Sequence, residues 1–410
     1  MTSSDPNPPT AALALLDGVK VLTLGAFVAG NVCPQILGEL GADVVKVETR
    51  KRPEALRHYF SHDHGEITAP GGFRTTAMYS LLSRSMSSVC VELDSPGGPE
   101  VLRSLAAAAD IVIENLGPGV MEKWGAGYDD LAVSNPRLVM VSISGYGRTG
   151  TRGSHRAYAS SISSYLGLTK IYAHEGTHFD FVAAYHAAFA ALGAWRRALA
   201  TGDGSYLDVS QMETGAAVMA PIYLDGLMNG GTWSAAPNEV PGSLLSTVVA
   251  CTGNDVWAAV ELEDSDDWAT LCDVLERRDL RDVDPAELDH RGALQAALEA
   301  WASELTPLQV TIKLQNAGLA AAPVQNGEDI WRDPQLRARS AFVEVTHPDL
   351  GVIEHPQSPD YMAVAPGRIT RRSRRLGEDT AEVLERWLGL DAAQRDDLEH
   401  DGAVWQAPED

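Results

Sequence analysis

The chain has 410 residues, of which 45% are hydrophobic and 21% are charged, ordinary values for a folded protein with one large core or two domains. Its 32 basic and 56 acidic side chains give a net charge of −24, which argues against a nucleic-acid-binding protein and against docking on anionic membranes. The first residues carry no basic segment, and no apolar run approaches the roughly 20 residues of a membrane helix, so we expect a cytoplasmic protein.

The four cysteines are widely spaced, and no pair has the Cys-x-x-Cys spacing of a zinc site. They lie in apolar stretches, at Cys33, Cys90, Cys251 and Cys272. We therefore predict buried thiols, no disulfide framework and no bound metal.

A βαβ unit is predicted after a disordered tail, residues 1–14. Val19–Leu24 has the composition of a strand, a glycine-bounded turn follows at 25–30, and apolar residues at helical spacing continue to Gly41. Asp43–Val47 is a second strand, so the unit predicts a parallel sheet. The turn lacks the GxGxxG fingerprint, so a nicotinamide cofactor is not indicated.

Two further predicted strands end in small, glycine-rich segments. A strand at 110–114 continues into Asn115-Leu116-Gly117-Pro118-Gly119, and a strand at 138–144 continues into Gly145-Tyr146-Gly147. Ligands of open α/β sheets bind beyond the C-terminal ends of the strands, and glycine lets a flat ligand lie against the backbone. Tight turns alone would explain the same residues, so both interpretations stay open.

Asp180 is the candidate catalytic residue. It lies in His178-Phe179-Asp180-Phe181, just ahead of a long apolar helix predicted at 182–199. An aspartate at a helix N-terminus is either a cap that accepts backbone hydrogen bonds or a nucleophile that the same amides keep ionised. The pattern by itself does not separate the two.

A second αβ block follows a linker at 229–241, which is rich in Gly, Ala, Asn and Pro. The fold class is therefore α/β, with a large Rossmann-like domain at 15–228 and 331–410 and a smaller αβ domain at 229–330. The remaining predicted elements are a strand at 206–210, a helix at 211–227, a strand at 256–262, helices at 268–277, 292–303 and 307–316, a strand near 323–324, extended chain at 333–365 and a last helix at 376–390.

Taken in order, these motifs resemble one family closely, the class III CoA-transferases (formyl-CoA transferase, carnitine CoA-transferase and α-methylacyl-CoA racemase). Each matching segment is weak alone, and together they are specific. They run from about residue 16 to residue 360 and include Leu16-Asp17-Gly18-Val19-Lys20-Val21-Leu22, residues 40–48, residues 109–119, Asn135-Pro136-Arg137-Leu138, residues 142–147, Thr201-Gly202-Asp203-Gly204 with Asp208-Val209-Ser210, and residues 317–324.

The resemblance implies that Asp180 is the catalytic aspartate, because the family places it one fixed stretch before the turn at 201–204. Asp180 would attack an acyl-CoA thioester, and a covalent aspartyl intermediate would pass CoA to a carboxylic acid. The resemblance also implies an interlocked-ring dimer, CoA esters as substrates and no permanently bound cofactor. Family positions and the two glycine-rich strand ends together give the predicted CoA-binding residues Val28, Lys46, Asn115, Leu116, Gly117, Lys123, Gly145 and Tyr146.

Two departures from the family pattern concern charged residues. An acid expected after the aromatic Tyr158 is replaced by Ala159. The family's Asn-Lys-Arg-Ser stretch is replaced by Ser87-Ser88-Val89-Cys90, which removes the basic pair at Ser88–Val89. Other long basic side chains could reach a phosphate instead, namely Arg50, Lys51, Arg52 and Arg84, or a partner chain could supply the nucleotide site.

A third departure concerns the racemase branch, which carries a histidine where Tyr158 stands, whereas His155 is three residues away. Proton abstraction needs an acid and a base, so the racemase interpretation lacks half of its pair. The alternatives to a transferase are an acyl-CoA racemase or isomerase and a non-catalytic subunit of a heteromeric transferase. The active form would be a homodimer or a heterodimer with a related chain.

Overall fold

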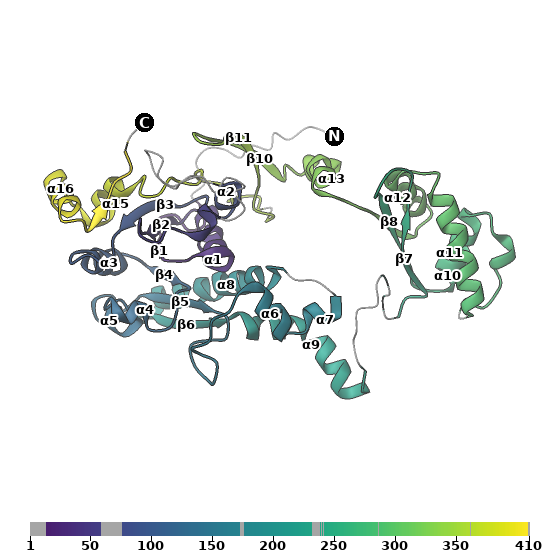
Figure 1. Ribbon diagram of the computed structural model, residues 1–410, viewed down its shortest axis with the longest axis horizontal. Helices are drawn as coiled ribbons and strands as arrows, with labels where there is room; N and C mark the ends of the chain where they lie inside the picture. The colour runs from purple at the N-terminus through teal and green to yellow at the C-terminus, as the bar shows by residue number, and fades with distance from the viewer. Residues whose placement is uncertain are drawn as a thin grey trace. The chain divides into compact units, whose positions relative to one another are not determined.

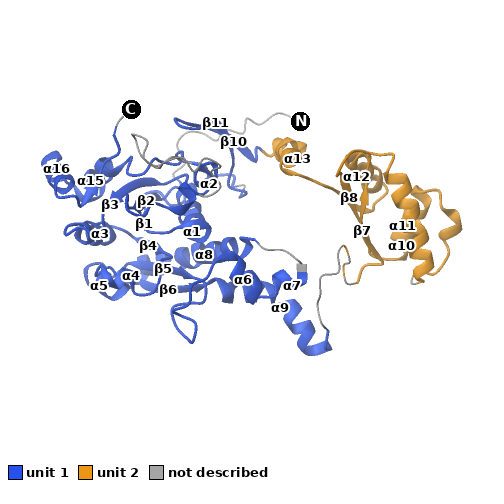
Figure 2. Ribbon diagram, in the orientation of Figure 1, with its two compact units in different colours: residues 1–233, 340–410 blue, residues 234–339 orange. Residues whose placement is uncertain are grey.

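The structure is a computed structural model that describes residues 14–58, 76–172, 176–231, 238, 240, 242–285, 287–360 and 362–408. Most of the predicted tail and part of the predicted linker lie outside these ranges. The chain forms two compact units, one of residues 1–233 with 340–410 and one of residues 234–339 (Figure 2).

The first unit is built on a sheet with the strand order β12-β3-β2-β1-β4-β5-β6. All neighbours pair in parallel except β12, which is antiparallel to β3, so the prediction of an α/β fold with a parallel sheet is confirmed. The strands are β1 (Lys20–Thr23), β2 (Asp43–Glu48), β3 (Ser87–Val91), β4 (Ile111–Glu114), β5 (Val139–Ser144), β6 (Ser205–Ser210) and β12 (Val404–Trp405). Because β1 lies between β2 and β4, the chain order reverses at β1 and β4, where open sheets of this kind bind ligands.

Helices cover both faces of this sheet (Figure 1). Alternate residues of one strand face opposite cores: Ile111 and Ile113 pack with the first set of helices and Val112 with the second. Burial on both sides explains why the strands read as continuous apolar runs. The first set is α1 (Phe27–Glu39), α2 (Ala77–Leu82) and α8 (His178–Thr201); the second is α3 (Gly98–Ala107), α4 (Val120–Lys123), α5 (Tyr128–Ser134) and α15 (Thr380–Leu388).

Strand β3 is absent from the sequence-based prediction, and it is buried by segments far along the chain. Ser88 N–H donates to Asp379 Oδ2 (2.9 Å), and Ser88 Oγ accepts from Gly377 N–H (3.0 Å). The pairing with β12 covers the outer edge of β3. The position where the family carries a basic pair is therefore interior here, and Val89 is fully buried.

The remaining elements of the first unit flank this core. They are η1 (Ala55–Arg57), α6 (Ala159–Tyr165), α7 (Leu168–Tyr172), α9 (Gln211–Asn229), the hairpin of β10 (Phe342–His347) with β11 (Gly351–Pro356), and α16 (Ala392–His400). The hairpin fits the predicted extended region, but that region begins with a helix, α14 (Pro334–Ala338). Asp333 caps α14 and Pro334 occupies its first turn, a start signal that the prediction overlooked.

The second unit is an antiparallel sheet, β7-β8-β9, packed on helices. Its core gathers Trp268, Leu271, Leu294 and Leu314 from those helices against the sheet. The elements are β7 (Leu245–Ala250), β8 (Trp257–Leu262), α10 (Ser265–Val274), η2 (Arg278–Leu280), α11 (Leu288–Ala302), α12 (Pro307–Asn316), β9 (Ala320–Val324), α13 (Gly327–Arg332) and α14 (Pro334–Ala338).

In the part of the chain that the structure describes, no helix has the length and apolar character to cross a bilayer. Within the same residues, no group of three or more His, Cys, Asp and Glu side chains is arranged to hold a metal ion.

Candidate active site

Helix N-termini and strand ends meet at the C-terminal edge of the large sheet. Helix α1 begins directly after β1, and α9 begins directly after β6. Helix α8 runs the other way, because its C-terminal turn leads into β6 and Gly204 N–H donates to Pro136 O (2.7 Å), just before β5. The N-terminus of α8 therefore lies at the same edge, and with it Asp180.

Asp180 is the third residue of α8, which begins at His178 rather than at 182 as predicted. Within the described residues its carboxylate accepts a hydrogen bond from the side-chain amide of Gln211, and Thr177, at the cap position, makes no side-chain cap. Burial raises the pKa of Asp180 to about 6, and the Gln211 hydrogen bond opposes part of that rise. A half-buried carboxylate whose neighbour is an amide rather than a cation is held in place without being neutralised, which suits a nucleophile.

Gln211 is a site residue that the sequence analysis missed. It is the first residue of α9, where Ser210 Oγ accepts from Glu213 N–H (3.2 Å) and fixes the helix start. The next residue, Met212, donates its N–H to Gly145 O (3.0 Å). The start of α9 thus joins Asp180 to the glycine-rich end of β5. The available signal was the position of Gln211 immediately after a predicted strand at this edge.

The end of β5 brings two predicted residues close to the α8 N-terminus. A Cβ on Gly145 would lie 2.2 Å from the Ala157 Cβ, so only glycine fits there. The Tyr146 ring packs edge-on against Tyr165 (5.3 Å between centroids) and belongs to the same apolar cluster as Phe179, the neighbour of Asp180.

The end of β4 is hydrogen-bonded to the turn that follows β1, so the two strands at the strand-order reversal are joined. Asn115 Oδ1 accepts from Ala26 N–H (2.7 Å), and Asn115 Nδ2 donates to Ala26 O (2.7 Å). Gly30 leaves the space that the Asn115 side chain occupies. Val28 follows in the first turn of α1 and is buried.

The other predicted CoA-binding residues have different surroundings. Gly117 and Lys123 are exposed, and Leu116 packs on the core beneath α3 and α4. Lys46 is only 1% exposed. Its ammonium donates to three oxygens at 2.5 to 2.8 Å, namely Gly25 O, Asn31 Oδ1 and Glu54 Oε2. A contact between these residues and CoA stays a prediction.

Of the basic residues considered as substitutes for the lost pair, Arg84 is buried and donates to Glu39 (2.7 Å). Arg50 and Lys51 instead line a cavity of about 320 Å³ at the ends of β2 and β3, with Glu92, Ser95 and Gly402. Arg50 is half-exposed, donates to Glu92 (3.0 Å) and lies over the Trp405 ring (5.2 Å to its centroid). Arg50 and Lys51 therefore line open space near the sheet edge.

Tyr158 and Ala159 start helix α6 beside the first turn of α1. The exposed ring of Tyr158 packs edge-on against Phe27 (6.0 Å between centroids), so this aromatic stands at the edge that carries Asp180. Ala159, where the family pattern expects an acid, is the first residue of α6.

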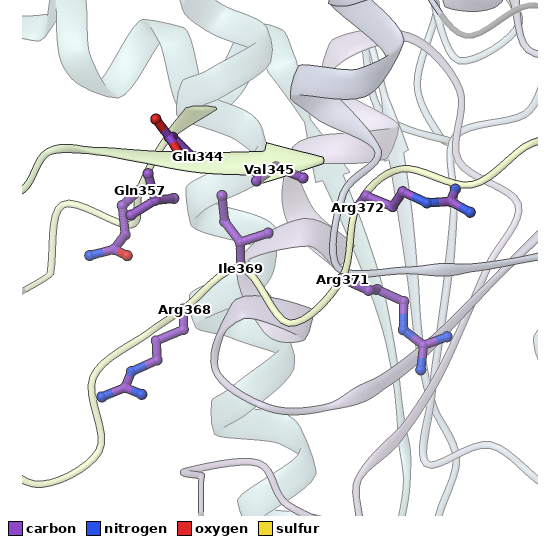
Figure 3. Close-up of a pocket in the computed structure, with 8 residues that line it drawn as sticks. Glu344, Val345, Gln357, Arg368, Ile369, Arg371 and Arg372 are labelled. Atoms are coloured by element: carbon purple, nitrogen blue, oxygen red, sulfur yellow. The ribbon is translucent and has the colours of Figure 1, made fainter. Parts of the chain in front are cut away.

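A second cavity, of about 350 Å³, lies between the β10–β11 hairpin and residues 368–372 (Figure 3). Arg368, Arg371 and Arg372 line it, but their side chains point in different directions, and Arg372 is paired with Glu378. Its lining includes none of the predicted site residues.

The chain is similar over most of its length to several CoA-transferases. A succinyl-CoA–D-citramalate CoA-transferase of Chloroflexus aurantiacus is 29% identical over 92% of this chain and 94% of that protein. The beta subunit of a succinyl-CoA–L-malate CoA-transferase of the same organism is 29% identical over 93% of this chain and 96% of its own. The human succinyl-CoA:glutarate CoA-transferase is 26% identical over 95% of this chain and 90% of its own.

Among solved structures, a CAIB/BAIF family protein from Brucella suis superposes with a TM-score of 0.81, at 24% identity, over 92% of this chain and 100% of that one. This likeness supports the fold. The family model described as CoA-transferase family III matches residues 16–380, which confirms the resemblance seen in the sequence motifs. This chain belongs to CoA-transferase family III.

Proposed function

We propose that this protein transfers CoA from an acyl-CoA to a carboxylic acid through a covalent intermediate on Asp180. The observation that carries the proposal is the Asp180 carboxylate at the C-terminal edge of the sheet, with the Gln211 amide as its partner in place of a cation. Family membership supplies the reaction class, and the raised pKa, about 6, still leaves the carboxylate mostly ionised at neutral pH.

The reaction conserves the thioester bond in four substitutions at acyl carbons. An Asp180 oxygen attacks the donor thioester carbonyl, the C–S bond breaks, and CoA leaves as a thiolate while the donor acyl group stays on Asp180 as a mixed anhydride. The thiolate attacks the aspartyl carbonyl, so the donor acid leaves as a carboxylate and an aspartyl-CoA thioester remains. The acceptor carboxylate attacks that thioester and releases the thiolate again, and the thiolate then takes the acceptor acyl group and frees Asp180. No ATP is consumed.

The relatives named above act on succinyl-CoA, so we infer succinyl-CoA as the donor and a small dicarboxylic acid as the acceptor. We infer that Arg50 and Lys51, which line the cavity at the ends of β2 and β3, bind the CoA phosphates.

We further propose that the active form contains two chains. Helices α8 and α9 expose large apolar side chains on the first unit: Phe181, Tyr185, Phe189, Leu224, Leu227 and Met228. A row of this kind marks an interaction surface. A heteromeric enzyme is the second candidate, because relatives of this chain are alpha and beta subunits of one transferase.

The test is to incubate the purified chain with succinyl-CoA and, in turn, malate, citramalate and glutarate. Formation of the acceptor CoA ester, with an Asp180 adduct seen by mass spectrometry in wild type and absent from Asp180→Ala, supports the proposal. Absence of both product and adduct from a protein that binds CoA contradicts it for the chain alone. Activity that appears only after a related chain is added would instead assign it to a heteromer.

A further inference from the structure

The first turn of α1 has an unusual backbone. Phe27 has a φ of +55°, in the left-handed region, which is strained for a residue with a side chain. Such strain persists only where the surroundings hold it in place. Here they do: Glu54 Oε1 accepts from Phe27 N–H (2.8 Å), and Asn31 Nδ2 donates to Phe27 O (2.6 Å).

A buried network holds this turn from below. Lys46 Nζ lies 2.8 Å from Glu54 Oε2, and the two side chains are 2% and 1% exposed. Lys46 also donates to Asn31 Oδ1 (2.7 Å) and to Gly25 O (2.5 Å), and Asn31 Nδ2 donates to Glu54 Oε2 (3.1 Å). Among these side chains, only the Glu54 carboxylate accepts hydrogen bonds from both the Lys46 ammonium and the Phe27 N–H.

The held turn lies within the proposed site. Asn115 joins its Ala26 to the end of β4, on the far side of the strand-order reversal. The Phe27 ring is 38% exposed and packs edge-on against Tyr158. Val28, a predicted CoA-binding residue, follows directly. A buried ion pair contributes little net stability compared with apolar side chains of the same size, so its effect here is best sought in geometry.

We propose that Lys46 and Glu54 are positioning residues: they hold the left-handed start of α1 and so place Phe27 and Val28 against the acyl-CoA. Lys46 acts from inside the fold and does not bind a phosphate. The kinetic part of this inference rests on the proposed function, whereas the structural part does not.

The first experiment replaces the ion pair by an apolar pair, Lys46→Met with Glu54→Met, which leaves no uncompensated charge. The matched control is Glu39→Met with Arg84→Met, since Glu39 and Arg84 form an equally buried pair (2.7 Å; 6% and 5% exposed) at the other end of α1. We expect kcat/KM with succinyl-CoA to fall about tenfold or more in the first variant and less than about twofold in the control, because small displacements at a reacting centre are costly. Equal losses in both variants would overturn the inference.

A rescue variant separates the Phe27 contact from the charge. Lys46→Met with Glu54→Gln keeps an oxygen that accepts from Phe27 N–H, so most of the lost kcat/KM should return. Succinyl-pantetheine, which lacks the nucleotide phosphates, should show the same fold-loss as succinyl-CoA in the double-methionine variant. A loss confined to succinyl-CoA would make Lys46 a phosphate ligand and refute a positioning role.

A crystal structure of the double-methionine variant tests the inference without any activity. We expect Phe27 to leave the left-handed region and its ring to leave Tyr158. An unchanged turn would overturn the proposal. If wild type shows no transferase activity but the turn relaxes in the variant, the proposed function fails and the structural role of Lys46 and Glu54 stands.

Discussion

Two carboxylates at the same edge of the large sheet have opposite surroundings. Glu48, at the end of β2, accepts from Arg57 Nε (2.9 Å), from Arg57 Nη2 (2.6 Å) and from the Tyr79 hydroxyl (3.1 Å). Burial raises its pKa, but the Arg57 charge and hydrogen bonds outweigh burial and hold that pKa at about 2. Asp180 has an amide partner, and burial raises its pKa to about 6. A buried carboxylate that is paired with a cation has a structural role, whereas a buried carboxylate without a cation partner stays reactive.

The largest expected effect is on catalysis. Asp180→Asn removes the nucleophile and should lower kcat by at least about 10³-fold, because the side-chain amides of the introduced asparagine and of its partner Gln211 are not nucleophiles. Glu48→Gln, at the same sheet edge, should keep activity per folded molecule within about threefold. Initial rates of acyl-CoA formation, normalised to folded protein, measure both. Comparable activity losses in the two variants would contradict a catalytic role for Asp180 and a structural role for Glu48.

The next effect is on stability. Glu48→Gln leaves the Arg57 guanidinium buried without its carboxylate, so we expect the free energy of unfolding to fall by about 3–5 kcal/mol. Urea denaturation at pH 7 measures this change. A loss below about 1 kcal/mol would contradict a stabilising role for the Glu48–Arg57 pair.

A smaller effect has the opposite sign. The raised pKa of Asp180 means that the folded protein binds the proton of this carboxyl more tightly than the unfolded chain does. Protonation of Asp180 therefore stabilises the fold fully below about pH 4, and this stabilisation is lost as the pH rises through about 6. Asp180→Asn should therefore be more stable than wild type by about 2 kcal/mol at pH 8, and the gain should shrink by pH 5. Paired denaturation curves at the two pH values measure it. A variant less stable than wild type at pH 8 would contradict the assigned cause.

The smallest effect concerns Gln211. Gln211→Leu removes the hydrogen bond that lowers the pKa of Asp180, so the acid limb of the pH–rate profile, expected near pH 6 in wild type, should move to higher pH. At pH 7 the rate should fall about two- to fifteen-fold, since a hydrogen bond to a charged group is worth about 1.5–3 kcal/mol, or roughly one to two pKa units. A rate that falls equally at every pH would point to lost geometry in place of a pKa change.

Local patterns predicted much of the fold. The apolar run at 19–24, the helical spacing up to Gly41 and the run at 43–47 suffice for the first βαβ unit, because each depends on near neighbours. Strand β3 escaped prediction because Ser87 and Ser88 interrupt its apolar run, and their partners come from the end of the chain. Polar residues in a strand become interpretable only when those distant partners are known.

The candidate site divides in the same way. Asp180 was identified from its family position, and Gly145 and Tyr146 from the end of a strand. Gln211 was not, because it meets Asp180 across 31 residues of sequence. The interior position of Lys46 depends on Glu54, which lies just ahead of the short η1 and outside any amphipathic pattern that could reveal it.

The burial of β3 by the end of the chain has a consequence for the order of synthesis. Ser88 meets Asp379 only after 291 further residues have been made. At the usual translation rate of about 5–20 residues per second, this takes roughly 15 to 60 s. A sheet that forms during that interval has an open β3 edge, and an open strand edge pairs readily with other chains. Chaperones that bind extended nascent chains should therefore matter most for this protein before β12 emerges.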